Sequence, residues 1–97
     1  MALGMAQRAK SQMPGVDSIT DTLGWVFYKR GNYENAKPLF EECVHNSPNT
    51  ASFVYHLGLN QIALGQPDLG KKHIEAALGL KLDGQDAKQA REKLSQL

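Results

Sequence analysis

The sequence has one cysteine, no long apolar run and almost no net charge. Cys43 has no second cysteine to pair with, which excludes an internal disulfide framework. No apolar run approaches the ~20 residues that span a bilayer, and residues 1–10 lack the basic-then-apolar order of a secretory signal. Eleven basic and ten acidic side chains leave a formal charge of +1, which removes the electrostatic argument for nucleic-acid binding. We therefore expect no membrane insertion and no nucleic-acid partner, while the compartment stays open.

Residue types that carry catalysis are scattered. His45, His56 and His73 fall in different predicted helices without the four-residue spacing of a metal-ligand pair, and surface or edge positions explain them better. Glu41 and Glu42 would point to different sides of one helix, which favours a solvated face over a catalytic carboxylate pair. These patterns predict no enzyme, no cofactor and no metal site.

Cys43 and the glycines give no further chemistry. Nothing beside Cys43 or any serine selects a nucleophile with its base, and we expect Cys43 to be a buried, inert thiol. The glycines form no phosphate-binding motif and fall instead at predicted helix crossings and helix ends.

What the sequence does have is an internal repeat. A shift of 34 residues aligns Ser18 with Ser52, Leu23 with Leu57, Gly24 with Gly58, Gly31 with Gly65, Lys37 with Lys71 and Glu41 with Glu75. The same shift pairs Ala2 with Ala36 and Pro14 with Pro48. A fixed period of this length is typical of stacked copies of one supersecondary unit.

Each period contains two amphipathic helical stretches. Apolar residues recur at three- and four-residue spacing through 17–30, 33–46, 51–64 and 67–80. Asp17 is a candidate N-cap, Gly31 and Gly65 follow helix ends, and Pro67 opens a helix. Helices at 2–12 and at 86–96, the second capped by Asp86, complete a prediction of six helices and no strands. The expected fold class is all-α, with neighbouring helices antiparallel.

Two glycines lie in the middle of predicted helices. Glycine in a helix interior lowers helix stability by ~1 kcal/mol relative to alanine, so we expect the packing around Gly24 and Gly58 to require the absence of a side chain. Small residues on the following helices, Ala36 and Gly70, support this expectation, because glycine opposite a small residue lets two helices approach closely. We predict that Gly24 faces the helix at 33–46.

The pattern of one repeat resembles a known family. Thr20, Leu23, Gly24, Phe27, Ala36, Phe40 and Pro48 occupy the positions of W-x2-L-G-x2-Y…A-x3-F…P, with only the tryptophan replaced outright. This arrangement resembles the tetratricopeptide repeat, and residues 23–31 resemble repeats of bacterial proteins of that kind. The resemblance implies an α-solenoid in a single domain, 1–97, cut from a longer array. It divides the chain into a half-repeat at 1–16, repeats at 17–50 and 51–82, and a helix at 83–97 that caps the core with a polar face.

The resemblance also implies a function. In this family the first helix of each pair lines a concave groove that holds a peptide or another protein, which implies a non-enzymatic interaction module or scaffold. The implied groove residues are Asp21, Trp25, Tyr28, Lys29, Tyr55, Leu59 and Ile62. Trp25 and Leu59 stand where the chaperone-binding subgroup has asparagines, so an apolar segment such as an amphipathic helix suits the lining better.

Two alternatives stay open. Trp25 lies two residues from Leu23 and from Phe27, so its indole is expected to leave the interhelical core, stack with Tyr28 and approach Tyr55 as a partly exposed anchor. The alternative is that the rings of Trp25, Tyr28 and Tyr55 pack against one another, or against the N-terminal helix, and bind nothing. At the level of the whole chain, the alternative to a peptide-binding module is a structural spacer or a unit that associates with itself as a homodimer.

Overall fold

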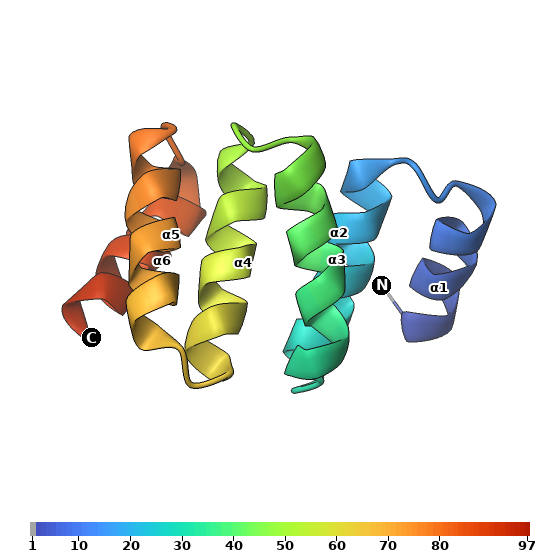
Figure 1. Cartoon of the computed structure of the whole chain (residues 1–97), viewed down its shortest axis with the longest axis horizontal. Helices are drawn as coiled ribbons and strands as arrows, with labels where there is room; N and C mark the ends of the chain where they lie inside the picture. The colour runs from blue at the N-terminus through green and yellow to red at the C-terminus, as the bar shows by residue number, and fades with distance from the viewer. Residues whose placement is uncertain (1) are drawn as a thin grey trace.

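The computed structural model describes residues 2–97, which fold into six α-helices (Figure 1). They are α1 (Leu3–Gln12), α2 (Asp17–Lys29), α3 (Tyr33–Asn46), α4 (Ala51–Ala63), α5 (Pro67–Gly79) and α6 (Gly84–Ser95). No strand occurs in this part of the chain. The prediction of an all-α fold is confirmed, and each helix begins and ends within two residues of its predicted bounds.

The helices pack as sequential pairs. In Figure 1, α1, α3, α4 and α5 stand next to one another, α2 lies partly behind α3, and α6 crosses behind α5 at an angle; the connections between successive helices alternate between the two ends of the stack. Helix α2 pairs with α3 and α4 pairs with α5, and the whole arrangement measures 38 × 24 × 22 Å. This arrangement is consistent with helix-turn-helix repeats, each of which buries one face against its neighbour.

Glycine and proline mark the helix ends as predicted. Gly31 and Gly65 adopt φ values of 79° and 81°, the left-handed conformation that ends a helix at little cost when no Cβ is present. Pro67 is the first residue of α5, where its missing N–H is not needed.

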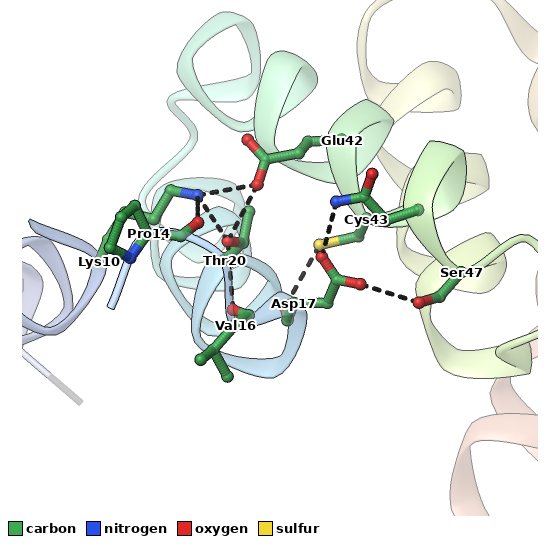
Figure 2. A network of polar contacts seen from close by, with 9 residues as sticks. Lys10, Pro14, Val16, Asp17, Thr20, Glu42, Cys43 and Ser47 are labelled. Atoms are coloured by element: carbon green, nitrogen blue, oxygen red, sulfur yellow. Dashed lines mark hydrogen bonds and ion pairs between the residues drawn. The ribbon is translucent and has the colours of Figure 1, made fainter. Parts of the chain in front are cut away.

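The two predicted N-caps are wrong. Asp17 is the first residue of α2, Val16 holds the cap position, and no side chain caps this helix. The Asp17 carboxylate instead accepts hydrogen bonds from Asn46 Nδ2 at 3.0 Å and Ser47 Oγ at 2.8 Å, at the end of α3 (Figure 2). These bonds lower the pKa of Asp17. Helix α6 begins at Gly84, so Asp86 lies inside its first turn and does not cap it.

The mid-helix glycines face the next helix as predicted, but only Gly58 lies opposite the predicted small residue. A Cβ added at Gly24 would lie 2.7 Å from Cε1 of the buried Phe40 ring on α3. A Cβ added at Gly58 would lie 2.9 Å from the carbonyl oxygen of Gly70 on α5. In the first pair the glycine therefore makes room for a ring, and in the second it lets two backbones approach.

The core consists of two clusters that meet beside α2. The first comprises Ala6, Leu23, Phe27, Ala36, Phe40 and Leu57. The second comprises Val54, Tyr55, Leu59, Ile74, Ala77, Leu82, Ala87 and Ala90, and therefore includes α6. Trp25, Tyr28 and Val44 contact both clusters. The first pair, the second pair and α6 thus share one apolar interior.

A polar network ties α1 to the first pair (Figure 2). Lys10 Nζ donates hydrogen bonds to Thr20 Oγ1 at 2.7 Å, to Glu42 Oε2 at 2.8 Å and to the carbonyl oxygen of Pro14 at 2.7 Å. Thr20 is fully buried, in the position where the repeat motif has tryptophan. The expectation of a purely solvated Glu42 is wrong, because its carboxylate pairs with Lys10 and anchors α1 to α3.

Within residues 2–97, no helix combines the length and the apolar character needed to cross a membrane.

Candidate binding groove

Alternate helices α2, α4 and α6 border an open hollow of about 230 Å³, called here the central hollow. It is lined by Trp25, Tyr28 and Lys29 of α2, Tyr55 and Leu59 of α4, and Gln89, Glu92, Lys93 and Gln96 in and just after α6. Five of the seven predicted groove residues therefore line one hollow. Asp21 and Ile62 do not.

Trp25 lies at the centre of an aromatic stack. Its ring centroid lies 5.0 Å from that of Tyr28, with 15° between the planes, and 4.3 Å from that of His56. Lys29 Nζ lies 5.2 Å from the indole centroid, within the range of a cation–π contact. The indole is half-buried and contacts both core clusters, whereas the sequence spacing led us to expect it outside the core.

His56 and Asp21 form a pair at the base of this stack. His56 Nδ1 lies 2.8 Å from Asp21 Oδ1, and the two side chains are only 13% and 14% exposed. Asp21 is therefore engaged with His56 and does not face the central hollow. The spacing of the histidines favoured a surface or edge position for His56, and its contact with Asp21 was not predicted. The repeat could have indicated it, because residues 35 apart lie at almost equivalent positions of adjacent repeats.

Tyr55 and Leu59 form the floor of the central hollow. They are 2% and 7% exposed, so the expectation that Tyr55 offers an exposed ring is wrong. Ala87 and Ala90 of α6 belong to the same core cluster and cover them. Burial raises the pKa of Tyr55 to about 12, with a smaller contribution from Asp86, and burial also raises the pKa of Tyr28.

Ile62 serves the packing of α4 on α5. Its side chain occupies the space that a Cβ at Gly70 would need. This position lies in the interface of the second pair, away from the central hollow. The family resemblance implied a groove position for Ile62, but Gly70 leaves a gap on α5 that the long isoleucine side chain fills.

The polar wall of the central hollow was missed entirely. Gln89, Glu92, Lys93 and Gln96 come from the region of α6, which was interpreted only as a polar cap. Helix α6 departs from the 34-residue pattern, so the alignment of repeats gave no position for its side chains. The order of helices was the available signal, since the helix after two complete pairs occupies the place of a first helix.

A second hollow lies on the other side of Trp25 and Lys29. This edge hollow of about 300 Å³ is lined by Ala2, Leu3, Trp25, Val26, Lys29 and Arg30, between α1 and α2. Trp25 and Lys29 line both hollows and therefore separate them.

Comparison with protein families identifies one unit of this architecture. Residues 22–50 are a tetratricopeptide repeat. The match runs from within α2 through α3 and includes Gly24 and Phe40, which make the close contact of the first pair. A comparison with curated proteins gives no match.

The repeat has a general functional meaning. A tetratricopeptide repeat implies a protein-interaction module and is typically non-catalytic. In residues 2–97, no three His, Cys, Asp or Glu side chains come together as a metal-binding group. Cys43, on the repeat's second helix, is fully buried, and burial raises the pKa of its thiol to about 12. The thiol is therefore neutral and inaccessible to a substrate.

Proposed function

We propose that this chain is a non-enzymatic interaction module that holds a peptide, or a segment of another protein, in the central hollow. The observation that carries the proposal is the position of that hollow between three alternate helices, with an aromatic floor and a polar wall. Recognition sites for segments of this kind combine an apolar floor with a few polar groups that fix orientation.

The lining suggests the chemistry of the bound segment. The half-buried rings of Trp25 and Tyr28 offer apolar surface, and a volume of about 230 Å³ suits one large apolar side chain. Gln89 and Gln96 each carry an amide that can both donate and accept, as a peptide backbone requires. The segment would therefore insert one apolar or aromatic residue and bond its backbone along α6. An amphipathic helix or an extended peptide meets these requirements.

The test is a selection of peptides followed by titration. A random library of 12-residue peptides is selected against the chain, and the strongest binders are titrated while the emission of Trp25 is recorded. Trp25 is the one tryptophan of the sequence and lines the hollow, so its emission reports occupancy directly.

A pair of variants on α6 separates filling of the hollow from a general effect on the helix. Gln89→Phe places a ring in the hollow and should weaken binding at least ~10-fold, the equivalent of 1.4 kcal/mol. Gln85→Phe adds the same ring to an exposed position of α6 outside the lining and should leave affinity unchanged. Equal affinity for both variants, or a library that yields no binder, would refute the proposal.

A second candidate function, self-association, is favoured by one observation. Met5 and Met13 are each 54% exposed and Val16 is 40% exposed, all on α1 or its connection to α2. Such residues often mark an interface between proteins. A dilution series by light scattering should then reveal a dimer that Met5→Gln weakens. A monomer at every concentration would eliminate this candidate.

A further inference from the structure

We propose that the edge hollow is a second binding site, for an acidic peptide segment that inserts one large apolar side chain between α1 and α2. This site is separate from the central hollow and extends beyond the function proposed above. It is defined by Leu3 of α1, Val26 of α2 and the adjacent cations Lys29 and Arg30.

The walls of the edge hollow favour an apolar side chain. Ala2, Leu3 and Val26 present aliphatic groups, and the half-buried indole of Trp25 closes the side toward α4. The volume of about 300 Å³ lies at the lower end of the range for ligand sites, which fits one or two side chains but no large ligand.

The charge at the mouth of the hollow has one sign. Lys29 and Arg30 are exposed, and neither takes part in an ion pair within residues 2–97. No acidic residue occurs from 2 to 16, while the exposed Arg8 adds another positive charge on α1. The first carboxylate of the chain, Asp17, lies at the far end of α2, ~20 Å away at 1.5 Å per residue. Glu92 of α6 lines the central hollow together with Lys29 but forms no ion pair with it within residues 2–97. An acidic segment at the edge hollow would therefore supply a charge that Lys29 and Arg30 do not find elsewhere in this part of the chain.

The exposed apolar residues of the chain itself are poorer occupants. Leu69 is 46% exposed on α5, where Asp68 and Glu75 balance Lys71 and Lys72 and leave no net charge. Met5 stands on the basic helix α1. Neither of these helices brings the negative charge that would complement Lys29 and Arg30, so a second copy gains no electrostatic attraction at this site. This argument favours a different, acidic protein as the partner.

The experiment removes the central hollow first. The random 12-residue peptide library is selected against the Gln89→Phe variant, in which the central hollow is filled, so failure of the first proposal does not affect this test. We expect enriched peptides that combine several acidic residues with one large apolar residue. In NMR spectra they should shift the amide signals of Leu3, Val26 and Arg30.

Charge reversal at the mouth provides the decisive comparison. Arg30→Glu should weaken the enriched peptides at least tenfold, and Arg30→Gln should weaken them less. The matched control Lys72→Glu reverses an exposed charge on α5 and should change nothing. Melting curves check that all three variants fold. Because Arg30 holds the cap position of α2, the Gln variant keeps the test valid if Glu disturbs the helix end.

Four results would overturn the proposal. The first is enrichment of neutral or basic peptides, or of none, and the second is affinity that both Arg30 variants leave unchanged. The third is self-association of the wild-type chain that Arg30→Glu abolishes, which would assign the hollow to a second copy. The fourth is binding of phosphatidylserine vesicles that Arg30→Glu abolishes without any acidic peptide being enriched, which would assign the cations to a membrane surface.

Discussion

Replacing Gly70 by alanine tests whether the second helix pair depends on the contact of two backbones. Alanine is the better helix former by ~1 kcal/mol, so propensity alone predicts that Gly70→Ala stabilises α5. The structure predicts the reverse. The new Cβ would lie 2.6 Å from the carbonyl oxygen of Gly58 and would overlap the side chain of Ile62. Gly70 and Gly58 are both buried, so no solvent-exposed group can move aside at small cost.

The size of the effect follows from this distance. Heavy atoms pack at ~3.5 Å or more, so the methyl group is almost 1 Å too close to a backbone atom. Relief requires α4 and α5 to separate, which lies at the upper end of the ~1–3 kcal/mol cost of overpacking. Subtracting the gain in propensity leaves a net loss of ~2 kcal/mol in the free energy of unfolding. For a chain of this size, that loss lowers the melting temperature by ~10 °C.

Gly79→Ala is the matched control on the same helix. A Cβ added at Gly79 meets no atom within 4 Å, so this variant should keep or raise stability. Urea unfolding of both variants, followed by circular dichroism, gives the two free energies directly. A Gly70→Ala protein as stable as the wild type would refute the claim that α4 and α5 can approach closely only because Gly70 has no side chain.

Three further predictions concern buried and half-buried groups. Burial raises the pKa of Cys43 from its ordinary 9.0 to about 12. The neutral thiol therefore makes its full contribution to the free energy of unfolding below pH 9, and this contribution is lost as the pH rises from 9 to 12. At pH 8 a thiol reagent should label Cys43 only after the protein has been unfolded in guanidinium. Lys10→Met should lower the free energy of unfolding by ~1 kcal/mol, because it breaks a charged hydrogen bond to the partly exposed Glu42. Hydrogen exchange of the amides in α1 should become faster in this variant. The control Arg8→Gln should leave the exchange rates unchanged. Trp25→Ala should lower the free energy of unfolding by ~2 kcal/mol, about half the value for a fully buried tryptophan, because the indole contacts both core clusters. A melting temperature equal to that of the wild type would place the indole outside the core.

The fold could be predicted from sequence because its determinants are local. Gly31 and Gly65 can adopt the positive φ that ends a helix, and Pro67 suits the first turn of α5 because its missing N–H is not needed there. The mid-helix position of Gly24 identified the next helix as its close neighbour, since a costly residue persists where packing requires it. The prediction that Asp17 is an N-cap was wrong because residues distant in the sequence bind its side chain. Asp17 has a capping side chain, but the bonds from Asn46 and Ser47 engage it, and those residues lie 29 and 30 positions away.

The site was harder because it depends on what covers each helix face. Tyr55 and Leu59 occupy positions that the repeat assigns to a groove, and the sequence alone gives no measure of their exposure. Both become buried when Ala87 and Ala90 pack against the same cluster. Ile62 was misplaced for a different reason, since its side chain fills the space left by Gly70. Periodicity gives the direction of a side chain on its own helix, but contact with a neighbour decides whether a ligand can reach it.

Helix α6 contributes both to the core and to the candidate site. It packs against the core cluster of α4 and α5 through the small side chains Ala87 and Ala90. Because these residues are small, α6 covers Tyr55 and Leu59 yet leaves the central hollow between itself and α2. Larger residues in their place would push α6 away or fill that space. Binding specificity in the central hollow should therefore come from the exposed side chains of α6 and the rings of α2, with α4 supplying only a rigid floor.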